Sequence, residues 1–405
     1  MCRYMPIIDA NRIDEILDRG TIVTILPTKK EFKEKLLSGK KLRFYWGFDA
    51  TSTTLHLSHA KNFILLEKFR KLGHEVIVLF GDFTARIGDP SEQSTTRKQL
   101  TRDEVLHNVK IWKKLVEPLM DFNDTENPPK IMYNHEWLSK LTLEDVVELS
   151  SHLTVQQMIE RDMFQKRLSE GKPIHLHEFL HPLMQGYDSV AMEVDVEMCG
   201  TDQIFNALTG RTLLKKLKDK DKMVVAVTLM ENPKTGELMS KSRGTGVFLD
   251  VSANEMYGQV MAQPDEMTDI LFTHLTSLPK TEINNIITTG PKEAKMHLAL
   301  LVTEIFHGKE NALHAQTVWN QSFSEKKIPE DIPEIIAITD SLLSEILVKN
   351  KLLSSKGEFR RLVDEGGIKI LTEESEEKIT DFQYVFSEEI ILKIGKKKFV
   401  KILTK

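Results

Sequence analysis

The chain has 405 residues, of which 40% are hydrophobic and 28% charged, with a formal net charge of −5. This length and composition are typical of a globular protein with two or three domains. The acidic balance excludes a uniformly basic nucleic-acid-binding protein, so any RNA contact must come from local patches. The presence of only two cysteines, Cys2 and Cys199, argues against a disulfide scaffold and a thiolate zinc site. The start is unlike a signal peptide and no apolar run is long enough to cross a membrane, so we expect a cytoplasmic protein.

The first predicted elements form a unit of strand, helix and strand. Residues 11–40 are predicted to be helical and to end at Gly39. Residues 42–48 (LRFYWGF) and 75–80 (EVIVLF) predict buried strands, and residues 56–72 between them carry apolar residues at helical spacing. Such a βαβ unit is the building block of a parallel α/β sheet.

Hydroxyl side chains in residues 51–54 are candidates for the N-cap of that helix, and Gly73 is a candidate for its stop. Residues 101–170 are predicted to be mainly helical. Residues 192–198 (MEVDVEM) alternate apolar and acidic residues, as a half-buried strand does. The remaining predicted elements are a helix over residues 204–217, a strand over 223–230, a loop over 232–246 and helices over 252–320.

Two histidines, His56 and His59, stand at the start of the predicted helix over residues 56–72. Their spacing puts them on one helix face, where free backbone N–H groups and the helix dipole attract phosphate. Their ring N–H groups can then donate hydrogen bonds to phosphate oxygens. Taken alone, such a pair is more often two ordinary surface or core histidines.

The loop over residues 232–246 supplies a second set of phosphate-binding groups. Lys241 gives a point charge, and Ser240 and Ser242 give hydroxyls. By itself, such a loop is more often a solvated basic segment. No Walker A sequence is present, which disfavours a P-loop kinase or ATPase. Together, the loop and the histidine pair predict a nucleotide site, and we expect no protein-bound metal.

Five segments resemble the bacterial tyrosyl-tRNA synthetases, and more narrowly the subgroup with an LMQGYDS segment. The resemblance covers nearly the whole chain, and the segments follow the order found in that family. They are GFDATSTTLHLSH (residues 47–59), GDFTARIGDPSEQSTTR (81–97), HEFLHPLMQGYDS (177–189), CGTDQIFN (199–206) and LMSKS (238–242).

This resemblance implies an α/β fold with a Rossmann-like parallel-sheet catalytic domain in residues 1–248, including a helical dimerisation insertion at about 115–175. It implies an α-helical anticodon-side domain in residues 249–330. A small S4-like α/β RNA-binding domain is implied in residues 338–405, after a linker near residues 326–333. The implied assembly is a homodimer.

The same resemblance implies tyrosine–tRNA ligase activity. The carboxylate of L-tyrosine attacks the α-phosphate of ATP to give tyrosyl-adenylate and pyrophosphate. The 3′ end of tRNA(Tyr) then takes the tyrosyl group, and Mg2+ accompanies the ATP. Such a reaction needs positioning and charge stabilisation rather than an enzyme nucleophile.

Site residues follow from the resemblance, position by position. The residues implied in catalysis, through the triphosphate, are Thr51, His56, His59 and Lys241. Those implied elsewhere around ATP are Gly47, Asp49, Ser58, Gly200, Asp202, Met239, Ser240 and Ser242. Those implied around tyrosine are Tyr45 and Asp188 at the phenol, Asp89, His181 and Gln185 at the ammonium, Gln203 at the carboxylate, and Thr84. Without the resemblance, Asp89 would be read as a turn residue before Pro90.

Three positions depart from the residues usual in that family. Ser58 replaces a glycine, and its Cβ could crowd the adenine. Leu238 replaces a common lysine, which leaves Lys241 alone to neutralise charge. His181 replaces a tyrosine near the substrate ammonium, so we expect it to work as a neutral imidazole.

Two other functions stay open at this point. Residues 177–181 form an H-E-x-x-H sequence, the pattern of zinc proteases, but Pro182 stands where such a helix must continue. The three departures also raise the alternative of a synthetase-like protein that binds RNA without catalysis.

The C-terminal region contains a predicted basic helix. Ser354 or Ser355 can cap it, and Lys356, Arg360 and Arg361 lie on or beside one face. Three basic residues alone more often form a solvated helix face. Their local basic character within an acidic chain, together with a resemblance to the S4 core, predicts contacts with tRNA phosphates.

Overall fold

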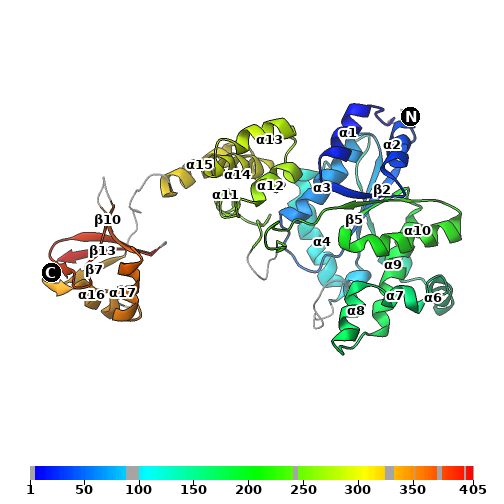
Figure 1. Ribbon diagram of the computed structural model, residues 1–405. Helices are drawn as coiled ribbons and strands as arrows, with labels where there is room; N and C mark the ends of the chain where they lie inside the picture. Colours follow the sequence, from blue (N-terminus) through cyan, green and yellow to red (C-terminus); the bar gives the residue numbers. More distant parts are fainter. Residues whose placement is uncertain are drawn as a thin grey trace. The chain divides into compact units, whose positions relative to one another are not determined.

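The structure is a computed structural model that describes residues 5–87, 100–239, 245–323, 333–350, 352–371, 376–395 and 398–404. By their contacts the residues divide into two compact units, Met1–Gln316 and Thr317–Lys405. Figure 1 labels many of the helices and strands of the two units.

The first unit is built on a six-stranded sheet in the order β1-β6-β5-β2-β3-β4, with β1 antiparallel to β6 and the other pairs parallel. After β1, the chain forms β2, moves outward through β3 and β4, and returns to the other side of β2 with β5 and β6. The strand order therefore reverses between β2 and β5, and open α/β sheets bind ligands at the carboxyl ends of strands at such a point. This confirms the predicted parallel α/β sheet. The strands are β1 (Ile22–Leu26), β2 (Arg43–Phe48), β3 (Glu75–Phe80), β4 (Lys130–Tyr133), β5 (Val196–Gly200) and β6 (Met223–Val227).

Two strands of the sheet lie in segments predicted to be helical, so those predictions were wrong in part. β1 interrupts residues 11–40, between α1 (Ala10–Asp18) and α2 (Lys29–Leu37). β4 interrupts residues 101–170. Both strands are short, and they gain their hydrogen bonds from neighbours distant in the sequence, which a local pattern does not reveal.

The helix after β2 begins at the predicted phosphate site. α3 (Leu57–Lys71) has His56 as its N-cap, so the hydroxyl groups of residues 51–54 do not cap it. Gly73 follows the helix with φ +92°, which confirms it as the predicted stop. A Cβ on Gly73 would lie 2.8 Å from Pro6 Cα, because the N-terminal segment crosses close to the end of the helix.

β5 differs from its prediction in both position and burial. Met192 belongs to the end of α9, and the strand begins at Val196. The strand is buried on both faces rather than on one, and Glu197 in it is 2% exposed. The acidic residue is buried because it forms an ion pair with Lys222, which is itself fully buried. The alternation of apolar and acidic residues therefore does not mark a solvent-facing side of this strand, because Glu197 is buried in an ion pair.

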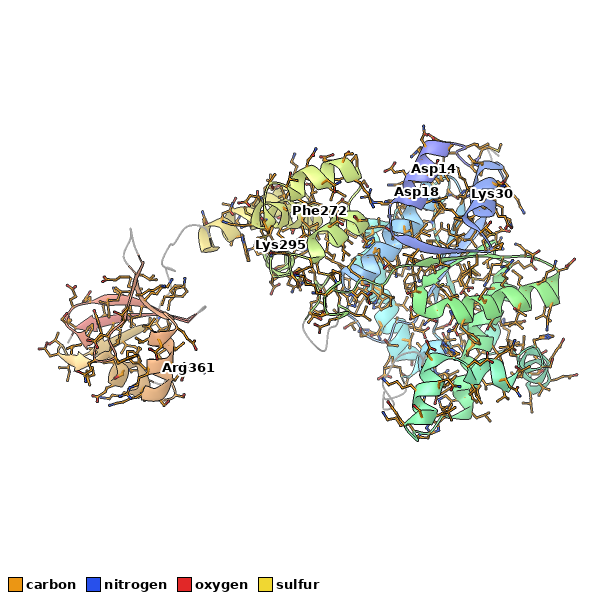
Figure 2. All side chains as sticks on the ribbon, in the orientation of Figure 1. Asp14, Asp18, Lys30, Phe272, Lys295 and Arg361 are labelled. Carbon is orange, nitrogen blue, oxygen red and sulfur yellow. The ribbon has the colours of Figure 1, made fainter. Side chains whose placement is uncertain are left out.

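Helices make up most of the rest of the first unit, and α9 and α10 pack side by side (Figure 1). The predicted helices over residues 204–217 and 252–320 are confirmed. In Figure 2, Lys295 is labelled on α14; its Nζ pairs with Asp265 at 2.7 Å. The helices after β3 are α4 (Arg102–Val116), α5 (His135–Leu138), α6 (Leu143–Ser150), α7 (Val155–Ile159), α8 (Asp162–Ser169), α9 (Leu176–Met192) and α10 (Ile204–Lys218). They are followed by α11 (Ala253–Met261), α12 (Met267–Leu275), α13 (Lys280–Ile287), α14 (Pro291–His307) and α15 (Lys309–Phe323).

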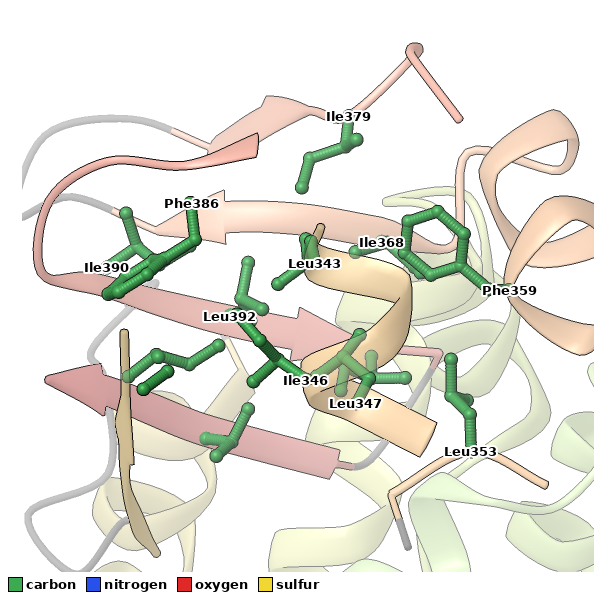
Figure 3. Close-up of a cluster of buried hydrophobic side chains, with 14 of the residues drawn as sticks. Leu343, Ile346, Leu347, Leu353, Phe359, Ile368, Ile379, Phe386, Ile390 and Leu392 are labelled. Carbon is green, nitrogen blue, oxygen red and sulfur yellow. The ribbon is translucent and has the colours of Figure 1, made fainter. Parts of the chain in front are cut away.

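The second unit contains a five-stranded sheet in the order β10-β9-β12-β13-β7 and a two-stranded sheet of β11 and β8. Buried apolar residues of α16, including Leu343 and Leu347, pack with Leu392 of β12 to form its core (Figure 3). β7 pairs with β13, so the larger sheet includes residues before 338. The elements are β7 (Glu334–Ala337), β8 (Ser341–Leu342), α16 (Leu343–Lys349), α17 (Lys356–Asp364), β9 (Ile368–Leu371), β10 (Glu376–Lys378), β11 (Val385–Phe386), β12 (Ile390–Ile394) and β13 (Lys398–Thr404).

Over the described ranges of both units, no helix combines the length and apolar character needed to cross a bilayer.

We expect Gly73→Ala to lower the free energy of unfolding by about 2 kcal/mol or more. Alanine would have to adopt a left-handed backbone conformation at this position, and its Cβ would clash with Pro6. Gly171→Ala is the matched control. Its φ is +64° but nothing lies within 4 Å of an added Cβ, so only backbone strain of about 1 kcal/mol is expected. Denaturant unfolding measures both variants, and equal losses would contradict the close crossing at Gly73.

Candidate active site

The predicted phosphate site begins at the amino end of α3. The rings of His56 and His59 have centroids 4.1 Å apart. Nδ1 of His59 accepts the backbone N–H of His56 at 3.3 Å, which leaves the proton of a neutral His59 ring on Nε2. Burial lowers the pKa of His56 to about 4 and that of His59 to about 3. Both rings are therefore neutral at pH 7 and can act as hydrogen-bond donors at a helix amino end.

The flanks of the lysine loop lie beside that helix start. His56 forms an antiparallel β-bridge with Phe248. Thr245 Oγ1 donates to the carbonyl of Leu238 at 3.3 Å, which joins the two sides of the loop. Residues 240–244 lie outside the described residues. The structure thus brings the two ends of the loop to the histidine pair, and the phosphate contacts of Ser240, Lys241 and Ser242 stay predictions.

The predicted adenosine residues lie at the carboxyl ends of β2 and β5. Gly47 is exposed although both of its neighbours in β2 are buried, and the nearest atom to an added Cβ would be Leu79 Cδ2 at 3.9 Å. The backbone at Gly47 is therefore open to close approach by a ligand. A Cβ on Gly200 would lie 2.4 Å from Asp202 Oδ1, so glycine is needed for that carboxylate to fold over the end of β5.

A chain of hydrogen bonds links the nucleotide side of the site to the amino-acid side. Thr84 Oγ1 donates to Asp49 Oδ1 at 2.8 Å. Asn134 Nδ2 donates to Thr84 Oγ1 at 3.1 Å and to Asp188 Oδ2 at 3.3 Å. A Cβ on Gly81 would lie 1.9 Å from Asp49 Oδ1, so this glycine makes room for the chain. The two halves of the site are therefore positioned by one network.

The two predicted phenol contacts are buried close together. Asp188 is 2% exposed, and Trp137 Nε1 donates to its Oδ1 at 2.7 Å. Burial raises the pKa of Asp188 well above its ordinary value, and the bonds from Trp137 and Asn134 oppose that shift. Tyr45 is 1% exposed. Burial, followed by the charges of Glu197 and Asp188, raises the pKa of Tyr45, so it keeps its proton.

The two glutamines predicted near the backbone of the amino acid are held together by a third amide. Asn206 Nδ2 donates to Gln185 Oε1 at 2.9 Å and to Gln203 Oε1 at 2.8 Å. Gln203 in turn donates to Asp202 at 3.0 Å, which ties this group to the adenosine side. Of the other predicted residues, His181 is 3% exposed, Met239 is 8% exposed, Thr51 and Ser58 are half-buried, and Asp89 lies outside the described residues.

Four residues of this site are missing from the sequence predictions: Gly81, Asn134, Trp137 and Asn206. Asn134 and Trp137 follow β4, in a segment predicted to be helical. Had the short KIMY strand been recognised, Asn134 would have been expected at the carboxyl edge of the sheet, next to the other candidates.

The H-E-x-x-H segment has its glutamate engaged in an ion pair. Contrary to the prediction, α9 continues through Pro182 to Met192, so the proline is no argument against a zinc protease. The side chain of Glu178 is instead held by Arg167, with a hydrogen bond of 2.9 Å to Oε1 and a second, shorter one to Oε2. Within the part of the chain that the structure describes, no group of three or more His, Cys, Asp or Glu side chains could hold a metal ion.

The predicted RNA-binding residues lie on α17. Ser355 caps this helix by accepting the N–H of Glu358, as one of the two predicted caps. Lys356, Arg360 and Arg361 are all exposed, and Figure 2 labels Arg361 on the helix. Lys356 forms an ion pair with Glu345 at 2.7 Å. The two arginines therefore present the less compensated positive charge.

Residues 37–324 match the family of class I tRNA synthetases for tryptophan and tyrosine. The chain is 38% identical to the tyrosine–tRNA ligase of Carboxydothermus hydrogenoformans, over 98% of this chain and 99% of that one. It is also 38% identical to the tyrosine–tRNA ligase of Thermotoga maritima, over 96% of each chain.

Solved structures agree in fold. A truncated mitochondrial tyrosyl-tRNA synthetase of Aspergillus nidulans superposes with a TM-score of 0.66 at 22% identity, over 77% of this chain and 94% of that one. A tyrosyl-tRNA synthetase of Archaeoglobus fulgidus in complex with L-tyrosine superposes with a TM-score of 0.58 at 18% identity, over 76% of this chain and 100% of that one. The family match and the full-length identity carry the assignment. The chain belongs to the class I tRNA synthetases as a tyrosyl-tRNA synthetase, a tyrosine–tRNA ligase that uses ATP in protein biosynthesis.

Proposed function

We propose that the ligase reaction proceeds in two steps at the site between β2 and β5. Tyrosine first reacts with ATP to form tyrosyl-adenylate and pyrophosphate, and tRNA(Tyr) then accepts the tyrosyl group. The observation that carries this proposal is the position of His56 and His59 beside both flanks of the lysine loop. A chain of hydrogen bonds from Asp49 to the buried Asp188 joins the nucleotide and amino-acid sides. The protein would act in the cytoplasm, because the buried free thiol of Cys199 suits a reducing compartment.

The nucleotide half of the site would work by positioning and charge stabilisation. Neutral His56 and His59 would donate to triphosphate oxygens at the amino end of α3, with Thr51 beside them. Lys241 would add a positive charge from the loop. Gly47, Gly200 and Asp202 would hold adenosine. Mg2+ would arrive with ATP, coordinated by its phosphate oxygens.

The amino-acid half would recognise the phenol. The hydroxyl of tyrosine would donate to Asp188 and accept from Tyr45. Phenylalanine would leave both buried groups without that partner, which is costly. Gln185 and Gln203, joined by Asn206, would meet the polar backbone of the amino acid.

The dimer of this proposal would use the segment between β4 and β5. Large apolar side chains in this segment are exposed, and burial against a second copy would remove them from water. They come from three successive helices and the start of α9. They are Leu143 (80% exposed), Val147 (62%), Val155 (61%), Leu168 (50%) and Leu176 (78%).

The second unit would bind tRNA through α17, as an S4-like module. Its exposed Arg360 and Arg361, with Lys356, would contact phosphates and position the tRNA rather than read its sequence.

We expect His56→Asn and His59→Asn each to lower the kcat of tyrosine-dependent ATP–pyrophosphate exchange about 100-fold, because each removes a donor to the triphosphate. The KM for tyrosine should be unchanged. His314→Asn, at an exposed position of α15, is the control and should retain full activity. A loss below about threefold in both site variants would rule out their role.

The triple variant Lys356→Ala/Arg360→Ala/Arg361→Ala should lower kcat/KM for tRNA about tenfold at physiological salt and flatten its dependence on salt, because phosphate contacts release counterions. Pyrophosphate exchange should not change. Equal loss of both activities would contradict the assignment of α17. The matched control replaces three basic residues at the end of α10, Lys215, Lys216 and Lys218, with alanine.

In analytical ultracentrifugation the protein should sediment with twice the 46.5 kDa mass of one chain. Leu143→Glu/Val147→Glu should give the monomer, because two charges would be buried in the contact. Val23→Glu, at a position 52% exposed on β1, is the control and should remain a dimer. A wild-type monomer at micromolar concentration would exclude the proposed dimer.

A further inference from the structure

A fully buried ion pair lies behind the tyrosine pocket. Lys222 is 0% exposed and Glu197 is 2% exposed. The Nζ of Lys222 donates to Glu197 Oε2 and, at 2.7 Å, to Ser189 Oγ. A well-packed apolar pair in the same place would commonly be as stable, since the desolvation of two charges offsets much of their attraction. Stability alone therefore does not account for the pair.

The packing of α9 against α10 makes room for this ammonium group. A Cβ on Gly210 would lie 2.6 Å from Lys222 Nζ and 2.8 Å from Ser189 Oγ. A Cβ on Gly186 would lie 3.1 Å from the backbone N of Gly210. Two glycines thus allow the helices to approach and the lysine to reach Ser189. Any larger residue at position 210 would displace the ammonium group.

Ser189 connects Lys222 to Tyr45 through hydrogen bonds. Its Oγ lies 3.1 Å from the Tyr45 hydroxyl, where either oxygen can be the donor, and it is also placed to donate to Glu197 Oε2 at 3.3 Å. A lysine ammonium can only donate, so Ser189 accepts from it and has one proton left to give. Because Glu197 Oε2 already accepts from the Lys222 ammonium, we assign the proton of Ser189 to the nearer oxygen, that of Tyr45. Tyr45 keeps its own proton, because burial and the nearby carboxylates raise its pKa.

We propose that Lys222, held by Glu197, acts through Ser189 to direct the proton of Tyr45 toward the hydroxyl of bound tyrosine. Donors and acceptors then run in one direction, from Lys222 through Ser189 and Tyr45 to the substrate phenol and on to Asp188. A chain that runs from a cation to a carboxylate strengthens each of its bonds. Lys222 and Ser189 are positioning residues for tyrosine selectivity. This inference rests on the proposed contacts of Tyr45 and Asp188 with the phenol.

The test is kcat/KM for tyrosine and for phenylalanine in pyrophosphate exchange. We expect Ser189→Ala to lower the tyrosine value about tenfold, the effect of one hydrogen bond, and to leave the phenylalanine value unchanged. A structural role would lower both values together and overturn the proposal. If Ser189 gave its proton to Glu197 instead, the substitution would free Tyr45, and an unchanged or improved tyrosine value would also overturn it.

A double-mutant cycle locates the effect. In a Tyr45→Phe background, Ser189→Ala should cause no further loss, because Ser189 acts only through the Tyr45 hydroxyl. An undiminished further loss would overturn the proposal. If Tyr45→Phe itself leaves tyrosine selectivity unchanged, the assigned pocket fails. If it lowers selectivity and Ser189→Ala does not, the pocket assignment stands and the role proposed for Lys222 and Ser189 fails.

Two further variants separate charge from packing. Lys222→Met/Glu197→Leu removes the pair together and leaves no unpaired charge, so it should fold and show the selectivity loss of Ser189→Ala. Thr209→Val removes a buried hydroxyl in the same α9–α10 interface, which donates to the carbonyl of Phe205 of its own helix at 3.1 Å. It should keep wild-type selectivity, and a loss equal to that of Ser189→Ala would overturn the proposal.

Discussion

The site depends on one backbone pairing between segments almost two hundred residues apart. The N–H of Leu57 donates to the carbonyl of Val247 at 3.0 Å, and that of Leu249 donates to the carbonyl of Leu55 at 2.9 Å. This short ladder holds the chain that follows the lysine loop against the start of α3. Without it, the loop and the histidine pair would be free to separate, because they belong to different elements of the fold.

The second constraint is that nucleotide and amino-acid contacts share buried polar groups. Thr84 bonds to Asp49 on the nucleotide side, and Asn134 bonds to both Thr84 and Asp188. Gln203 likewise bonds to Asp202 on the nucleotide side, and Asn206 joins it to Gln185. Buried polar groups of this kind are costly when one partner is lost, so substitution of Thr84 or Asn134 is expected to affect both halves of the site.

The sequence was informative where a pattern is local. β2, α3 and β3 follow from a long apolar periodicity with a glycine stop, and the sheet class follows from them. β1 and β4 are too short for such a signal and are fixed by distant neighbours, so Asn134 and Trp137 after β4 were missed as well. The alternating segment around Glu197 misled because a buried lysine partner, Lys222, is distant in the sequence. Family resemblance supplied the predicted site residues, but not the amides and glycines packed around them.

The central claim is that the histidine pair and the lysine loop act on one triphosphate-binding site beside the phenol pocket. The most direct measurement is a crystal structure of the enzyme with ATP and the unreactive alcohol analogue of tyrosine. We expect phosphate oxygens within hydrogen-bond distance of His59 Nε2 and Lys241 Nζ, and the phenol hydroxyl on Asp188. Phosphates bound away from α3, or a phenol ring excluded from Asp188, would contradict it.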